Sequence, residues 1–193
     1  MRWVQEWSEI LLDDNGDVDC VVGALIDITY EKNLEAQRLK VEQLSGKYLI
    51  FSLAGEKYGL NILEVKEIIR MEPITPLPEA PDFIPGIINL RGQVITVIDL
   101  RRQLELTGAS YGDGACIIVM EYQADGNQNR RGILAEGVSG VIFIHGRDIE
   151  PPPAVAGERN SGCLLGLAKT DQGIHLLLNS SQLFHQPGIP VMS

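Results

Sequence analysis

The sequence has no long hydrophobic run, few cysteines and no excess of positive charge. None of its apolar runs reaches the ~20 residues of a membrane-spanning helix, and Glu6 and Glu9 interrupt the start, where a signal peptide would be apolar. The three cysteines, Cys20, Cys116 and Cys163, lie far apart and form no C-x-x-C motif. We therefore expect a protein of the reducing cytoplasm that does not insert into a membrane and holds no disulfide framework.

The charge balance is acidic, and the basic residues do not cluster. There are 16 Lys and Arg against 26 Asp and Glu, which gives a formal net charge of −10. Such a chain repels phosphate backbones and anionic lipid surfaces. We therefore expect no nucleic-acid partner.

Residue types that carry catalysis or hold metals do not occur at usable spacings. Gly137-Val138-Ser139-Gly140 begins like a nucleophile elbow, but Val141 stands where that motif needs glycine, so Ser139 is better explained as a turn residue. Residues 13–19 are acidic, but a calcium loop that starts at Asp13 needs glycine at its sixth position and glutamate at its twelfth. Those positions hold Val18 and Ala24. The three histidines do not have metal-ligand spacing. The sequence thus predicts no catalytic residue, no metal and no cofactor, and hence a protein that is not an enzyme.

From Lys47 onward, short apolar runs alternate with turn signals roughly every ten residues, which is typical of β-barrels and sandwiches. The proline-rich residues 71–85 predict an extended connector, and residues 179–185 predict a short last helix. The expected hairpins pair residues 49–53 with 57–60, 116–122 with 131–138, and 163–168 with 174–178.

The most informative stretch is residues 84–100. Two β-branched apolar runs flank the dipeptide Arg91-Gly92. Because Gly readily takes the positive φ of a tight turn, this pattern predicts a hairpin with Arg91-Gly92 at its turn. One permanent positive charge would then stand at the rim of a rigid β core, which suits recognition of a partner better than covalent chemistry.

This stretch resembles the CheW-like domain, the adaptor domain of bacterial chemotaxis arrays. The pattern F-I-x-G-x-I-N-L-R-G-x-V-I-x-V-I-D-L-R occupies residues 83–101, and a V-x-E-I motif stands upstream as Val65-Lys66-Glu67-Ile68. With its flanks, the match covers residues 47–186 and leaves residues 187–193 as a tail. The resemblance implies a mainly β fold of two small five-stranded, SH3-like β-barrels.

The resemblance also implies a non-catalytic adaptor that couples chemoreceptors to a CheA-type histidine kinase. The implied partners are the regulatory domain of such a kinase and the cytoplasmic tip of a chemoreceptor. In the family, the arginine of N-L-R-G and the valine and glutamate of V-x-E-I lie on the surface used for this coupling. The candidate partner-binding residues here are Val65, Glu67, Gly86, Asn89, Leu90, Arg91 and Gly92.

Arg91 and Glu67 support a more specific hypothesis. Both charges stand beside core strands and match paired family positions, so one interpretation is an ion pair across a shared groove. The alternative is an arginine that bonds the carbonyls of its own turn. Gly86 also matches a family glycine, of a kind that permits close backbone approach.

Residues 1–28 precede the match and predict a β-hairpin, with Asn15-Gly16 as its turn. The spacing up to Asp27-Ile28-Thr29 resembles the C-terminal end of a PAS sensor domain, without the part that encloses a ligand. An alternative function is therefore that of a PAS-linked sensory or regulatory output protein of another two-component pathway.

Residues 29–46 predict a linker helix, capped by Thr29 and ended by Gly46. Five of its positions follow a two-heptad seam. This seam either joins two copies, as a homodimer through residues 1–46, or packs on the protein's own body. The seam positions are Tyr30, Leu34, Gln37, Val41 and Leu44.

Overall fold

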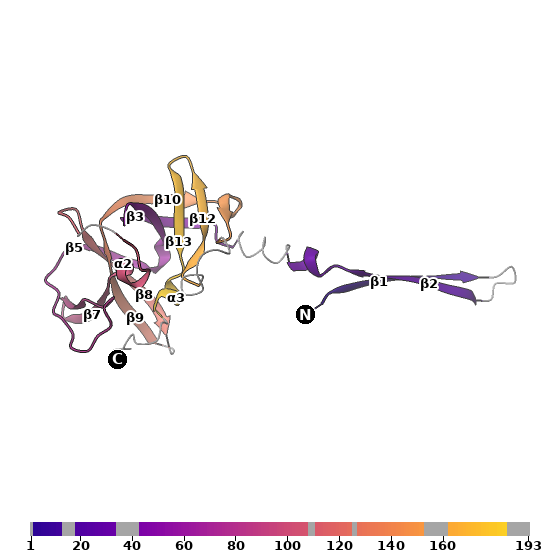
Figure 1. Ribbon diagram of the computed structural model, residues 1–193, viewed down its shortest axis with the longest axis horizontal. Coiled ribbons are helices and arrows are strands. Elements are labelled where there is room, and N and C mark those ends of the chain that lie inside the picture. Colours follow the sequence, from indigo (N-terminus) through magenta and orange to yellow (C-terminus); the bar gives the residue numbers. More distant parts are fainter. Residues whose placement is uncertain are drawn as a thin grey trace. The chain divides into compact units, whose positions relative to one another are not determined.

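The computed structural model of the chain forms two compact units, residues 1–43 and 44–193 (Figure 1). The described residues are 2–12, 18–33, 43–107, 111–124, 127–152 and 162–184. None of the helices within these ranges is long and apolar enough to cross a membrane.

The first unit contains the predicted hairpin. Strands β1 (Val4–Leu12) and β2 (Val18–Asp27) pair antiparallel, and the turn expected at Asn15-Gly16 lies outside the described residues. The likeness of this segment to the end of a PAS domain stays a prediction.

A helix follows the hairpin at residues 29–33. Its N-terminus differs from the prediction, because the Asp27 carboxylate accepts the N–H of Thr29, while the Thr29 hydroxyl bonds the backbone of Trp3. Residues 34–42 of the expected helix lie outside the described residues. The predicted end at Gly46 is wrong, since residues 43 and 44 form a turn and Gly46 begins a strand.

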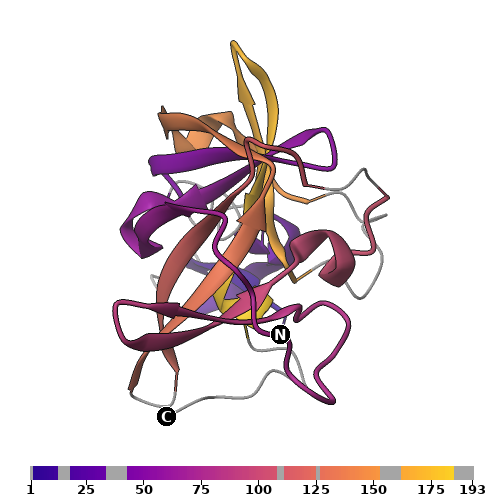
Figure 2. The ribbon, with the colours of Figure 1, turned by 90° about the vertical axis from the view of Figure 1, so that its left-hand side faces the viewer.

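The second unit contains two curled β-sheets (Figures 1 and 2). The first sheet has six strands in the order β10-β3-β4-β13-β12-β11. Two 3-10 turns, η1 (Ile62–Glu64) and η2 (Gly146–Asp148), and the short helix α3 (Ser180–Phe184) accompany it. Its strands are β3 (Gly46–Leu53), β4 (Glu56–Asn61), β10 (Gly137–Ile144), β11 (Ile149–Glu150), β12 (Leu164–Thr170) and β13 (Gly173–Leu178).

The second sheet has five strands in the order β5-β8-β9-β7-β6. The short helix α2 (Leu100–Gln103) follows β7, and the connector between β5 and β6 is extended, as the prolines predict. The strands are β5 (Val65–Arg70), β6 (Gly86–Leu90), β7 (Gln93–Ile98), β8 (Cys116–Ala124) and β9 (Asn127–Ala135).

The mainly β architecture is confirmed, with two differences of detail. The first sheet has six strands instead of five, because β11 adds a two-residue pairing to β12. The turn expected around Ser139 is wrong, because β10 continues through it. The register against β3 shifts between Val138 and Gly140, so Ser139 is the extra residue of a β-bulge.

Strand β8 is buried on both faces, and this places the two cores. Ile118 and Met120 point into the cluster shared with the first sheet, which also contains Phe51 of β3. The alternate residues Ile117 and Val119 point into a second cluster inside the five-stranded sheet. That sheet therefore curls around its own core, and the β6–β7 hairpin forms part of its rim.

Candidate functional site

The β6–β7 hairpin has the turn that the sequence predicts. Leu90 pairs with Gln93, so the turn consists of Arg91 and Gly92 alone. Both have positive φ, +53° and +85°, as a type I′ turn requires. The Asn89 side chain accepts the N–H of Gly92 at 2.9 Å, which fixes the turn from within.

Arg91 forms the predicted ion pair with Glu67. Its Nη2 lies 2.8 Å from Glu67 Oε2, across 24 residues of sequence. The Arg91 side chain is 79% exposed and that of Glu67 is 24% exposed. The guanidinium thus stands out from the surface while its carboxylate is partly covered. Asn89, and not Arg91, provides the side-chain bond within the turn.

A β-bulge in β5 gives Glu67 its position. Val65 lies opposite Met120 and Glu67 opposite Val119, so Lys66 is the extra residue between them. Val65 packs partly buried against the core shared by the two sheets. The V-x-E-I motif therefore combines one anchoring side chain with one that reaches the surface.

Two of the predicted residues have clear packing roles. Leu90 packs partly buried on the core of the five-stranded sheet. Gly86 lies at the far end of β6, with φ +148°, and an added Cβ would come 2.1 Å from the carbonyl oxygen of Thr75. The structure thus brings Glu67, Asn89, Arg91 and Gly92 together at the turn and leaves Gly86 apart from them.

A neighbouring polar network was missed by the sequence reasoning. Glu121 of β8 accepts Arg130 Nε at 3.0 Å, accepts Gln128 Nε2 at 2.7 Å and lies 3.7 Å from Lys66 Nζ. The prediction put residues 123–130 in a loop, whereas β9 already begins at Asn127. With the longer hairpin, Glu121 and Arg130 are direct cross-strand partners, so a correct hairpin register was the missing signal.

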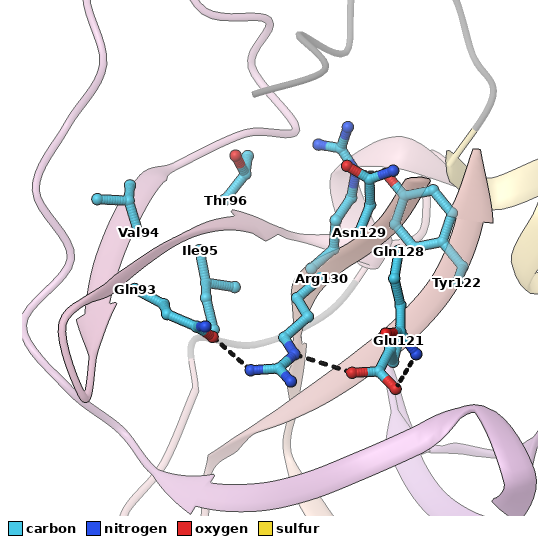
Figure 3. Close-up of a pocket in the computed structure, with 10 residues that line it drawn as sticks. Gln93, Val94, Ile95, Thr96, Glu121, Tyr122, Gln128, Asn129 and Arg130 are labelled. Atoms are coloured by element: carbon cyan, nitrogen blue, oxygen red, sulfur yellow. Dashed lines mark hydrogen bonds and ion pairs between the residues drawn. The ribbon is translucent and has the colours of Figure 1, made fainter. Parts of the chain in front are cut away.

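This network borders a hollow of about 570 Å³ between β7, β8 and β9 (Figure 3). Its wall is polar, with amide and charged side chains from all three strands. The Arg130 guanidinium reaches across it from Glu121 to Gln93. Within the described ranges, no cluster of three His, Cys, Asp or Glu side chains is placed to hold a metal ion.

Comparison with known proteins agrees with this architecture. Residues 47–188 match the family model described as "CheW-like domain". The chemotaxis protein CheW of Klebsiella aerogenes is 34% identical over 146 residues, which are 76% of this chain and 86% of that protein. Protein FrzA of Myxococcus xanthus is 33% identical over 142 residues, 71% of this chain and 84% of that protein.

A solved structure is similar as well. The scaffolding protein TtCheW from Thermoanaerobacter tengcongensis superposes with a TM-score of 0.66 and 37% identity, covering 75% of this chain and 91% of that one. The family match, the similar relatives and the similar solved structure agree, and the chain therefore belongs to the CheW-like domain family.

Proposed function

We propose that the surface around Arg91 and Glu67 is the partner-contact surface of this chemotaxis adaptor. Its family is one of non-catalytic scaffolds, and relatives carry the name of chemotaxis protein CheW. The chain couples chemoreceptors to a CheA-type histidine kinase. Its direct partners are the kinase's regulatory domain and the cytoplasmic tip of a receptor, both met in the cytoplasm.

The observation that carries this proposal is the rigid display of one exposed charge. A type I′ turn, the Asn89 bond and the Glu67 carboxylate all restrict Arg91. A side chain that is already ordered loses less entropy on binding. Exposed ion pairs add little to folding stability, typically about 0–1 kcal/mol, so this pair is better explained by recognition than by stability.

A charge swap tests the proposal. The full chain carrying Arg91→Glu, Glu67→Arg or both is titrated against the regulatory domain of a CheA-type kinase and against a receptor-tip fragment. We expect each single variant to weaken binding about tenfold, equivalent to ~1.4 kcal/mol. The double variant restores the ion pair and recovers part of the loss.

Arg147→Glu is the matched control, because Arg147 is equally exposed, lies beside Asp148 and belongs to η2 at the first sheet. Equal binding by the Arg91 variant and this control contradicts a role of the surface in coupling. Loss in both single variants without recovery in the double contradicts the role of the pair.

We also propose a division of labour along the chain. Residues 47–186 form the adaptor domain, residues 1–28 a PAS-like hairpin, residues 29–46 a linker and residues 187–193 a tail. The hairpin exposes apolar side chains on both faces, and Trp7, Val22 and Ile26, each about half exposed, share one of them. Since an isolated two-stranded hairpin is marginal in water, this face supports homodimerisation through residues 1–46.

Light scattering of the full chain across a concentration series tests the dimer. We expect a dimer that dissociates in Trp7→Glu and persists in Ser8→Glu, because Ser8 is the next residue along β1 and points to the opposite face. A monomer at every concentration contradicts dimerisation and leaves the adaptor proposal standing.

A further inference from the structure

The hollow between β7 and β9 exists because these two parallel strands stop pairing. Their ladder runs from Ile98↔Ile133 back to Thr96↔Arg131 and ends there. Beyond it, residues 93–95 of β7 pair with β6 on the outer side, and residues 127–130 of β9 pair with β8. Within the described part of the chain, Val94 is the one residue of this stretch whose backbone N–H and C=O face the gap, because Gln93 and Ile95 form hydrogen-bonded pairs with β6.

One side chain bridges the gap where the ladder ends. The Arg130 guanidinium donates through Nε to Glu121 and through Nη1 to the side-chain oxygen of Gln93 (Figure 3). The second bond goes to a neutral amide. A carboxylate accepts a shorter and stronger hydrogen bond from a guanidinium than an amide does, so an acidic ligand group would displace Gln93 while Arg130 keeps its bond to Glu121.

The charges around the hollow favour such a ligand. The cations Arg91, Lys66 and Arg130 have side chains 79%, 48% and 32% exposed. Their carboxylate partners are more covered, at 24% for Glu67 and 19% for Glu121. Three cations thus stand beside two carboxylates that are better covered, although the whole chain has a net charge of −10.

We propose that the hollow binds an extended, acidic segment of a partner protein. The segment lies along β7 and pairs with the backbone of Val94, and one of its carboxylates takes the place of the Gln93 amide on Arg130. Main-chain pairing provides affinity and the carboxylate provides selectivity, as in other cases of strand addition. The inference rests on the proposed function, because it assumes a chain that acts by binding partners, and it adds a second contact beside Arg91.

The test titrates two short blocked peptides into the full ¹⁵N-labelled chain, one alternating valine with glutamate and the other valine with lysine. We expect the glutamate peptide to shift the amide signals of residues 93–96 and 128–131 and to saturate them below about 1 mM. The lysine peptide should leave them unchanged. Because the net charge of the chain attracts the lysine peptide, a preference for glutamate must come from the local site.

Three variants test whether Arg130 and Gln93 control peptide binding. Arg130→Gln should weaken glutamate-peptide binding about tenfold, the loss of one charge-assisted hydrogen bond. Gln93→Ala removes the competing amide and should strengthen binding. Arg147→Gln has the same change in charge at a distant exposed site and should have no effect.

The proposal is overturned by any of three results: no shifts in the hollow at about 1 mM peptide, an equal response to the lysine peptide, or equal behaviour of Arg130→Gln and Arg147→Gln. No kinase or receptor takes part in this titration. Its failure is therefore distinct from failure of the proposed function, which is decided by the Arg91 and Glu67 variants against those partners.

Discussion

Replacing Gly86 by alanine is expected to destabilise the adaptor domain through one backbone contact. The new Cβ would lie 2.1 Å from the carbonyl oxygen of Thr75 and 2.7 Å from its carbonyl carbon. Those are backbone atoms, so no side-chain rotation relieves the clash. The connector that contains Thr75 must therefore move away from β6. Two backbone hydrogen bonds between Thr75 and Ile87, of 2.8 and 2.9 Å, hold the connector in its present position.

The magnitude follows from two contributions. A non-glycine residue at φ +148°, outside the left-handed α region, costs about 1–3 kcal/mol. Losing the two hydrogen bonds between Thr75 and Ile87 costs about 1 kcal/mol each. We therefore expect Gly86→Ala to lower the free energy of unfolding by about 3–5 kcal/mol.

Gly92→Ala is the matched control. Gly92 also has positive φ, +85°, but an added Cβ would meet nothing within 4 Å. Only the conformational cost of about 1–2 kcal/mol applies, so the two variants should differ by about 2 kcal/mol. Equal losses in the two variants would refute the reasoning from backbone contact.

Urea denaturation followed by far-UV circular dichroism measures both variants. Tryptophan fluorescence is unsuitable, because the only two tryptophans, Trp3 and Trp7, belong to the first unit. The m-value should stay constant, since the substitutions change stability and not the surface exposed on unfolding.

Three further predictions concern single side chains of the same domain. Burial, with a smaller contribution from the Lys57 charge, lowers the pKa of His175 below its usual 6.5. The unfolded chain therefore takes up the proton first, and the free energy of unfolding should fall as the pH drops below 6.5; an unchanged pH slope in His175→Gln contradicts this. Asp99 accepts a hydrogen bond from Tyr111 Oη at 2.7 Å and another from the backbone N–H of Arg101. Asp99→Ala should therefore lower the free energy of unfolding by about 3 kcal/mol in urea titrations, and a loss below about 1 kcal/mol would be inconsistent with these bonds. Arg91→Ala should change stability by less than about 1 kcal/mol, so a larger loss would mean that its effect on partner binding is indirect.

Much of the site was predictable because its geometry is local. The Arg91-Gly92 turn follows from two apolar runs around a dipeptide that accepts positive φ, and antiparallel pairing of adjacent strands then places Asn89 beside it. The Arg91–Glu67 pair spans 24 residues, and it was reached through motif resemblance instead of local pattern. The Glu121–Arg130 pair was missed, because polar residues at the end of a hairpin look the same whether the strands continue or a loop begins.

The sequence by itself determined the hairpins and the turn chemistry, since each depends on neighbouring residues. Only the tertiary structure decided which strands meet across long separations, such as the parallel pairs β7 with β9 and β13 with β4. Alternation tells which face of a strand is buried but not which strand lies next to it. The hollow beside Arg130 arises from where one such parallel pair stops, and no local pattern in the sequence marks that point.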